Sequence, residues 1–379
     1  MAFRFVHTAD IHLDSPLRSL ALRNPDLAEL VGDASRQAFV SIIDLCLAER
    51  VDALVIALSR ISKQLVFPDT VTIFGGRPQS VLQTAGGLDV AFHGLSFANP
   101  KAPESLLPKY PAAREGAVNV GIMHTSLAGS PGHDVYAPCS IADLHGHGFD
   151  YWALGHIHVR QVHPGASTVV MTGMPQGRDI NEAGEKSATL VTIREDRSVE
   201  IEEKLTSIAQ FERASVDLTG TVEWSEVVGR VRSALEGIRG SVRSRHVVVR
   251  LGLAGASPLS WALIRDRDLL LAEAEQAAEQ TGDTWVEKLE LDLAPQSAET
   301  ADDVADPIFE LAQSMHANVK SEAFRAEARA LVQKMIADLP PDGRDFAGRD
   351  EAGLELFIDK VLASGADLVT ARLKAGGAQ

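Results

Sequence analysis

The stretch "DYWALGHIHVRQ", residues 150–161, places two histidines directly after an apolar run. Residues 151–154 predict a buried strand, because a short apolar run bounded by polar residues and glycine is typical of one. His156 and His158 are separated by one residue, so an extended chain puts both imidazoles on the same side. Gly155 lets another backbone or a ligand come close. The stretch therefore predicts a binding site at the end of a buried strand.

Strand-like and helix-like segments alternate over about the first 205 residues. "FRFVHTA" predicts a strand, "ASRQAFVSIIDLCLAER" an amphipathic helix and "VDALVIA" a second buried strand. Later strands are predicted from "VTIFGG", "LDVAFHGLSFA", "AVNVGIMH", "STVVMTG" and "SATLVTI". This alternation favours a layered α/β domain.

The rest of the chain predicts two further regions. Residues 206–297 combine strand-like segments such as "RHVVVRLGL" with the helix pattern "WSEVVGRVRSALEGI", which indicates a small α+β domain. Residues 298–379 are acidic and helical, with "LPPDGRD" between two of the helices. The expected domains are therefore 1–205, 206–297 and 298–379.

Composition limits the possible classes of protein. An apolar content of 45% supports real cores, and the apolar runs are far shorter than the ~20 residues that span a bilayer. The two cysteines, Cys46 and Cys139, cannot form a disulfide framework, and we expect a soluble cytoplasmic protein without an export signal. The formal charge of −16 argues against broad electrostatic adhesion to nucleic acid.

Histidines gather in the first half of the chain, where ten of the twelve lie at or before His163. Asp10 and His12 follow the first predicted strand, and His124 ends a middle one. Ligands of α/β sheets collect beyond the carboxyl ends of strands, so these side chains are expected to meet His156 and His158. Imidazoles with a carboxylate suit Mn²⁺, Fe²⁺ or Zn²⁺.

The ordered motifs "DIHL", "MHTSL" and "GHIH" resemble those of the calcineurin-like metallophosphoesterases. The longer stretches "HTSLAGSPGHDVYAPCSIADLHGHGFDYWALGHIHVRQV" and "GMPQGRDINEAGEKSATLVTI" are similar to the DNA repair exonuclease branch of that family. That branch includes the nuclease subunit that works beside an SMC-like ATPase at DNA ends. The resemblance covers at least residues 3 to about 205.

The resemblance implies a fold, a reaction and partners. The family fold is a β-sandwich flanked by helices, here followed by a capping domain and a helical C-terminal region. Its reaction is Mn²⁺-dependent hydrolysis of DNA phosphodiesters by two metal ions. Residue by residue, Asp10, His12 and His158 match ligands of one ion, and His124 and His156 match ligands of the other. The implied partners are DNA and an SMC-like ATPase subunit docked on the helical region; a homodimer stays open, and no membrane is expected.

Two family motifs have no counterpart in this chain. The resemblance expects "GD-x-x-D", whose aspartate bridges both metals, directly after Ala57, and then "GNHD", but the sequence continues from Leu58 as "LSRISKQLVFPDTVTIF". A true deletion, an omitted segment and a degenerate family member remain open. No catalytic residue is assigned, and we expect at most one well-bound metal and little nuclease activity.

Other polar residues give weaker signals. Asp52 precedes its strand, and Asp69 reads as a turn residue; His93, His133, His145 and His147 also read as non-ligands, the last two in a surface loop. Arg243, Arg245 and Arg250 form the best basic cluster of the C-terminal half. Two rival functions stay open: a phosphodiesterase for nucleotides or other small phosphoesters, and a catalytically inactive scaffold that binds a partner ATPase.

Overall fold

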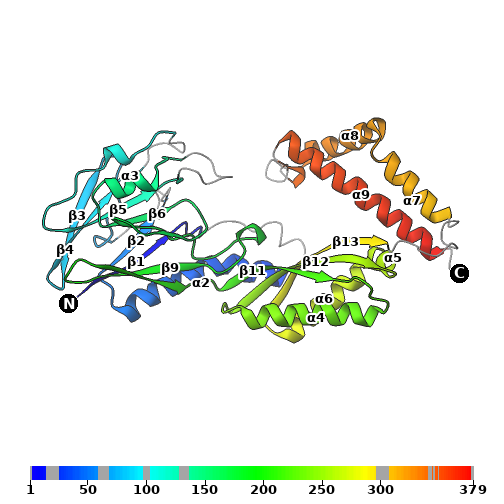
Figure 1. The fold of residues 1–379 in the computed structure, drawn as a ribbon, viewed down its shortest axis with the longest axis horizontal. Helices are drawn as coiled ribbons and strands as arrows, with labels where there is room; N and C mark the ends of the chain where they lie inside the picture. Colours follow the sequence, from blue (N-terminus) through cyan, green and yellow to red (C-terminus); the bar gives the residue numbers. More distant parts are fainter. Residues whose placement is uncertain are drawn as a thin grey trace. The chain divides into compact units, whose positions relative to one another are not determined.

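The computed structural model describes residues 2–13, 25–58, 68–96, 103–127, 136–295 and 307–376, apart from 340–343, 345 and 349. Contacts within the chain divide it into two compact units. Unit 1 contains Met1–Arg213, Ile238–Val249 and Asp283–Glu287, and unit 2 contains the remaining ranges, Ala214–Gly237, Arg250–Gly282 and Lys288–Gln379. Figure 1 shows the elements of both units. The boundaries at 205 and 297 stay a prediction.

Unit 1 holds two sheets and the helices that cover them. The four-stranded sheet has the order β10-β9-β1-β2, and the six-stranded sheet has the order β3-β4-β5-β6-β8-β7. The elements are β1 (Phe3–Ala9), α2 (Pro25–Glu49), β2 (Ala53–Ala57), β3 (Gln79–Ala85), β4 (Leu88–Gly94), η1 (Leu107–Lys109), β5 (Val118–His124), α3 (Ile141–Gly146), β6 (Tyr151–Gly155), β7 (Gln161–His163), β8 (Thr168–Met171), η2 (Ile180–Glu182), β9 (Ser187–Ile193) and β10 (Val199–Leu205).

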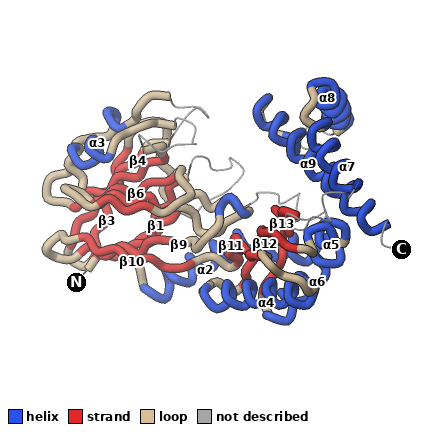
Figure 2. The backbone as a smooth tube through the Cα atoms, turned by 45° about the vertical axis from the view of Figure 1, so that its right-hand side comes forward, coloured by secondary structure: helices blue, strands red, loops and turns tan. Residues whose placement is uncertain are grey.

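The two sheets pack face to face and share an apolar core (Figure 2). Phe5 of β1 makes edge-on ring contacts with Phe92 of β4 at 5.7 Å and with Tyr151 of β6 at 5.5 Å, which joins the sheets. On the outer face of the four-stranded sheet, α2 packs Ile42 against Val6 and its neighbours. Helix α3 packs on the other sheet. This arrangement confirms the predicted β-sandwich flanked by helices.

The carboxyl ends of several strands meet at one place. Strands β1 and β2 are parallel, with Ala9 opposite Ala57, and β5 and β6 are parallel, with His124 opposite Gly155. A Cβ atom at Gly155 would lie 2.7 Å from the carbonyl oxygen of Ala57 and 2.9 Å from Cβ of Ala9. The absent side chain at Gly155 therefore lets the ends of β1, β2 and β6 come together, and the backbone that approaches it is that of Ala57.

One predicted strand is wrong and one was missed. Residues 71–75 of "VTIFGG" form no strand, because Val71 and Ile73 are exposed and the segment ends in two glycines. The edge strand is β3 instead, whose mostly exposed side chains give little apolar alternation. Both cysteines are free, as expected for reduced thiols.

Strands β11 (Ala209–Asp217), β12 (His246–Ser257) and β13 (Thr284–Pro295) form a three-stranded sheet in the order β11-β12-β13. Helices α4 (Trp224–Ser241), α5 (Ser260–Arg265) and α6 (Arg267–Thr281) lie between these strands in sequence, and α7 (Pro307–Asn318), α8 (Glu322–Asp338) and α9 (Glu351–Gly376) form the helical C-terminal region. Across the described ranges, we find no helix with the length and apolar character needed to cross a bilayer.

Candidate metal centre

The predicted ligands all lie at strand ends in unit 1. Asp10 and His12 follow β1, His124 is the last residue of β5, and His156 and His158 follow β6. Three of these five residues have left-handed backbone conformations, with φ of 45° at Asp10, 48° at His12 and 109° at His156. Such conformations are unfavourable for residues other than glycine and concentrate at functional sites. These strained conformations indicate that this edge of the sheets is a candidate functional site.

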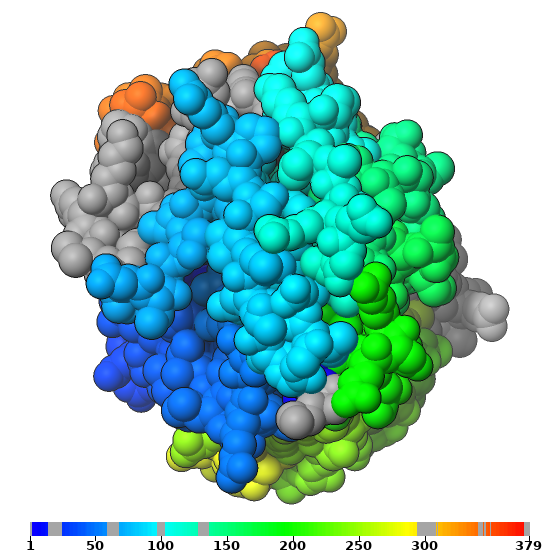
Figure 3. Space-filling model, turned by 90° about the vertical axis from the view of Figure 1, so that its left-hand side faces the viewer, coloured from blue at the N-terminus to red at the C-terminus, as the bar shows by residue number. Residues whose placement is uncertain are grey.

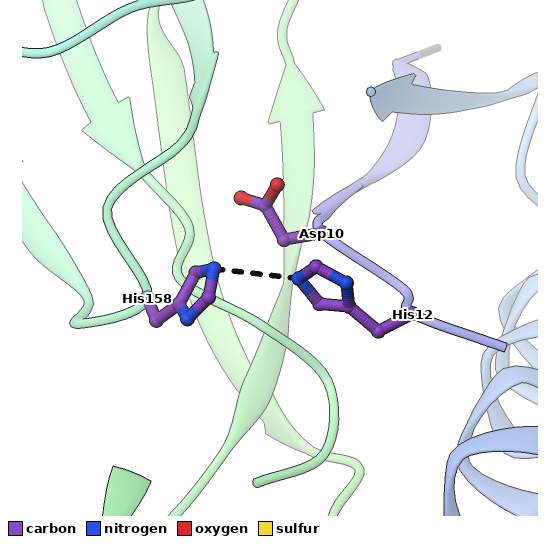
Figure 4. A group of neighbouring side chains, drawn as sticks. All are labelled: Asp10, His12 and His158. Carbon is purple, nitrogen blue, oxygen red and sulfur yellow. Dashed lines mark hydrogen bonds between the residues drawn. The ribbon is translucent and has the colours of Figure 1, made fainter. Parts of the chain in front are cut away.

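The rings of His12 and His158 face each other, and the carboxylate of Asp10 lies beside them (Figure 4). Their ligand atoms lie within 4.8 Å of each other, and no other such group of three or more histidine, cysteine and acidic side chains occurs in the described ranges. The Nε2 atoms of His12 and His158 are 3.4 Å apart. Two nitrogens bound at ~2.1 Å in a tetrahedral geometry lie ~3.4 Å from each other, so the pair is spaced to share one ion.

Glu182 and Arg178 support His158 from behind. The carboxylate Oε1 of Glu182 lies 2.8 Å from Nδ1 of His158. An ionised carboxylate only accepts, so Nδ1 donates and the lone pair of Nε2 faces His12. Arg178 holds Glu182 in turn, donating from its backbone N–H at 2.8 Å and from Nε at 3.1 Å. A carboxylate behind a histidine is the usual partner of a metal-bound imidazole.

His124 and His156 form the second part of the site. Their ring centroids are 5.1 Å apart, and Tyr136 stacks on His156 with an interplanar angle of 17°. The backbone N–H of His156 donates to Oδ2 of Asp10 at 2.8 Å, and Nδ1 of His124 lies 3.8 Å from Oδ1 of Asp10. The structure thus brings all five predicted residues together around Asp10. Their role as metal ligands stays a prediction.

Protonation leaves the site ready to bind a cation at neutral pH. Burial, followed by the charge of Arg178, lowers the pKa of His12 to about 4. Burial and then the neighbouring His156 lower the pKa of His124 to about 3. Burial raises the pKa of Asp10 to about 6, although the N–H of His156 and the charge of His158 oppose the rise. Neutral imidazoles and an ionised carboxylate are the forms that bind metal.

Glu182 keeps its charge despite partial burial. Burial alone would raise the pKa of Glu182, but the hydrogen bonds from His158 and Arg178 outweigh it and hold that pKa well below its usual range. The sequence prediction missed both Glu182 and Arg178. Their i, i+4 spacing in "GRDINE" was the available signal, because an arginine four residues from a glutamate can hold it in a helical turn.

The end of β2 contributes backbone but no carboxylate. Ala57 is the last residue of β2, opposite Ala9, and its carbonyl is a hydrogen-bond partner of His124. Leu58 follows, at the position where the family resemblance expects the start of "GD-x-x-D". Among the residues that the structure describes, no acidic side chain other than Asp10 joins the cluster with His12 and His158.

The other polar residues lie outside this cluster. His145 lies on α3 and His147 is its C-cap, so the surface loop predicted for them is wrong: Ser140 caps a helix that begins there. His93 is buried in a separate hydrogen-bond network, and His133 lies outside the described residues. In the basic cluster, Arg243 is paired with Glu185 and Arg250 lies 4.0 Å from Glu290.

Comparison with known proteins gives two matches. The family model described as "Metallophosphoesterase YhaO, middle domain" matches residues 211–294. The chain is 27% identical over 336 residues to the uncharacterized metallophosphoesterase YhaO of Bacillus subtilis (strain 168), an alignment that covers 76% of this chain and 81% of YhaO. These matches relate the chain to metallophosphoesterases over most of its length.

Proposed function

We propose that this chain, a relative of the metallophosphoesterases, is a metal-dependent phosphodiester hydrolase of the DNA repair exonuclease type. The observation that carries the proposal is the cluster of Asp10, His12 and His158, with two imidazole nitrogens 3.4 Å apart and a carboxylate behind one of them. The exonuclease branch and the choice of DNA ends rest on the motif resemblance of residues 3 to about 205.

The donor atoms present fit a divalent transition metal. Asp10 offers oxygen, and His12 and His158 offer nitrogen, a set that suits Mn²⁺, Fe²⁺ or Zn²⁺ and leaves positions open for substrate. We propose Mn²⁺, in keeping with the resemblance. A bound divalent ion would polarise a phosphoryl oxygen and lower the pKa of a water molecule.

The chain's own residues orient and charge the site. Glu182 accepts from Nδ1 of His158 and fixes its ring with Nε2 toward His12, while Arg178 keeps Glu182 in place. Asp10 supplies the negative charge, and its carboxylate is fixed by the N–H of His156. Tyr136 stacks on His156 and restricts its ring. These contacts hold the imidazoles ready before substrate arrives, which lowers the reorganisation needed on binding.

We further propose that the segment with "GD-x-x-D" and "GNHD" is deleted between Ala57 and Leu58. The alignment with YhaO spans 336 positions but covers only 76% of the 379 residues, so YhaO has residues that this chain lacks. The position of the deletion, after Ala57, rests on the motif resemblance. Without a bridging carboxylate, this chain is expected to hold one metal well and to have little nuclease activity. A catalytically inactive scaffold that binds a partner ATPase is the alternative favoured by the same gap.

The proposed partners are DNA and an SMC-like ATPase subunit, with a homodimer as a further assembly, and the proposed location is the cytoplasm. The helical region supports a docking role, because Leu331 and Met335 of α8 and Leu356 of α9 are 58–71% exposed. Free cysteines agree with a reducing compartment. The net charge of −16 favours a second candidate, a phosphodiesterase for nucleotides or other small phosphoesters, because small substrates need no basic groove.

A direct comparison of substrates tests the function. Purified protein with Mn²⁺ is assayed on bis(p-nitrophenyl) phosphate and on end-labelled duplex DNA, with EDTA and His158→Ala as controls. Weak, metal-dependent cleavage of both substrates that His158→Ala loses, with DNA trimmed from its ends, supports the proposed function. Cleavage of the small ester alone favours the second candidate. Metal uptake with no hydrolysis of either substrate favours the scaffold.

A further inference from the structure

A second set of catalytic-type side chains lies on the six-stranded sheet, away from the metal centre. Ser80 of β3 stands opposite His93 of β4 in the antiparallel register, and Asn119 lies on the next strand, β5. Oγ of Ser80 is 2.7 Å from Nδ1 of His93, and Nε2 of His93 is 2.9 Å from Oδ1 of Asn119. Ser80 is exposed, whereas His93 and Asn119 are 1% and 4% exposed.

The orientation of Asn119 fixes the protons of this network. Its Nδ2 donates to the carbonyls of Arg114 at 3.2 Å and Ala117 at 3.0 Å, and its Oδ1 accepts the N–H of Arg114 at 2.7 Å. Oδ1 therefore faces His93, so Nε2 of His93 donates and carries the proton. Nδ1 of His93 is then an acceptor, and the hydroxyl of Ser80 donates to it.

The surroundings keep His93 neutral and still. Its ring stacks on Phe149 with centroids 4.4 Å apart and an interplanar angle of 20°. Burial lowers the pKa of His93; the hydrogen bond that its Nε2 donates to Asn119 opposes this, and the nearby charges of His147 and Arg114 add to it. A neutral, fixed imidazole that accepts a hydroxyl proton is the arrangement of a general base beside a nucleophile.

We propose that Ser80, His93 and Asn119 form a serine hydrolase centre for short carboxylic esters, independent of any metal. Oγ of Ser80 bonds to the acyl carbon while its proton passes to Nδ1 of His93, and the carbonyl electron pair moves onto oxygen. The bond to the alcohol then breaks, and His93 returns the proton to the leaving oxygen. Water repeats the two steps on the acyl-serine and releases a carboxylic acid. Asn119 is a positioning residue.

The accessible surface around Ser80 suits a small substrate. The segment carrying β3 and β4 lies at the surface of the face drawn in Figure 3. Among the described strands, β3 is the edge of its sheet, so part of its backbone faces no other described strand. Leu82 lies on the same side of β3 as Ser80 and is 37% exposed, which gives a short acyl chain one apolar contact.

A second serine–histidine pair in the chain provides a matched control. Oγ of Ser167 is 3.0 Å from Nδ1 of His145, but Ser167 is buried, and its backbone N–H also approaches Nδ1 at 3.4 Å. Within the described residues, no amide or carboxylate side chain contacts the other nitrogen of His145 at hydrogen-bond distance. This pair has the contact without the exposed nucleophile or the orienting amide.

Labelling and turnover test the proposal in the presence of EDTA. The full chain is treated with a fluorophosphonate probe, and hydrolysis of p-nitrophenyl acetate is followed in parallel. We expect Ser80→Ala to abolish labelling and to lower hydrolysis at least about tenfold, while Ser167→Ala retains both. A wild-type chain that is not labelled, or a Ser80→Ala variant that is labelled and active like the wild type, would overturn the proposal.

A cysteine variant gives a readout that does not need turnover. Ser80→Cys places a thiol beside His93, so its alkylation by iodoacetamide should begin well below the ordinary thiol pKa of ~8.5. Ser233→Cys, an exposed position on α4, serves as the reference thiol, and the raised pKa of Cys46 and Cys139 keeps the background low. Adding Asn119→Ala should return the pH profile to that of the reference, with circular dichroism reporting the fold. A Ser80→Cys profile equal to the Ser233→Cys profile would refute the proposal.

Discussion

Replacing Glu182 with glutamine is the most informative single change at the candidate metal centre. The substitution keeps the size of the side chain and an oxygen that can accept from Nδ1 of His158. It removes the negative charge that lies 2.8 Å from that imidazole and leaves Arg178 without its ionic partner. The imidazole of His158 becomes a weaker ligand for a cation, and the positive charge of Arg178, no longer paired with Glu182, repels the cation.

The expected loss of affinity follows from the strength of these contacts. A hydrogen bond to a charged group contributes about 1.5–3 kcal/mol, and Glu182 is only 10% exposed, so solvent screens it little. A change of 1.4 kcal/mol is a factor of ten, so Mn²⁺ affinity should fall by about 10- to 100-fold. The fold should be unaffected, because the side chain keeps its shape.

Calorimetric titration of the metal-free protein with Mn²⁺ measures this change. Glu200→Gln is the matched control, because Glu200 also makes a two-point contact with an arginine, Arg194, but both are 56% exposed and far from any ligand in sequence. Its affinity should equal that of the wild type. If Glu182→Gln binds Mn²⁺ within twofold of the wild type, Glu182 does not orient a metal ligand, and the reasoning from the Nδ1 contact is wrong.

Three further outcomes are expected. His124→Ala and His158→Ala should lower Mn²⁺ content in elemental analysis while His147→Ala should not; equal content in all three variants would contradict the assigned cluster. Metal-free protein should lose stability as the pH falls from 6.5 toward 3. In this range histidines bind protons in the unfolded chain, whereas the buried histidines with lowered pKa stay neutral in the folded chain. His7 is one such residue, because burial and then the charge of Arg160 lower its pKa to about 3. His7 should reduce the free energy of unfolding by up to ~1.4 kcal/mol per pH unit in this range, so His7→Gln should flatten the plot of stability against pH. An unchanged slope would exclude His7 as the cause. Inserting a family-type segment with "GD-x-x-D" and "GNHD" after Ala57 should raise bound Mn²⁺ from one to two ions and restore nuclease activity, whereas robust Mn²⁺-dependent nuclease activity of the unmodified chain would refute the need for it.

The fold was predictable wherever burial is strong on both sides of a strand. Strand β1 has six buried residues of seven and β6 is buried throughout, so their apolar runs stand out in the sequence. Strand β3 has no such run, because it is an edge strand with mostly exposed side chains. The segment 71–75 has the β-branched residues of a strand but pairs with no strand that the structure describes, and tertiary context overrides that local preference.

The site was predictable only in part. The candidate ligands form a recognisable sequence pattern, whereas the residues that support them do not. Histidines spaced by one residue after a strand are visible as a pattern, and the structure places them together. Glu182 and Arg178 look like a surface ion pair until the fold brings His158 to 2.8 Å from the carboxylate. Ser80, His93 and Asn119 sit on three strands, and each alone is an ordinary residue.

The carboxylate of Asp10 is expected to limit how many metal ions the site can hold. Its Oδ2 accepts from the N–H of His156, its Oδ1 faces His124 at 3.8 Å, and the same carboxylate belongs to the cluster with His12 and His158. Both histidine pairs therefore depend on one negative charge. Two unit charges ~4 Å apart repel by about 4 kcal/mol at an effective dielectric of 20, and two divalent ions repel more strongly. An ion bound by His12 and His158 would also bind the carboxylate of Asp10. The second pair, His124 and His156, would then offer only neutral ligands beside a neighbouring cation. A second carboxylate at the end of β2 would reduce this imbalance, so we expect the residue after Ala57 to decide whether a second ion binds.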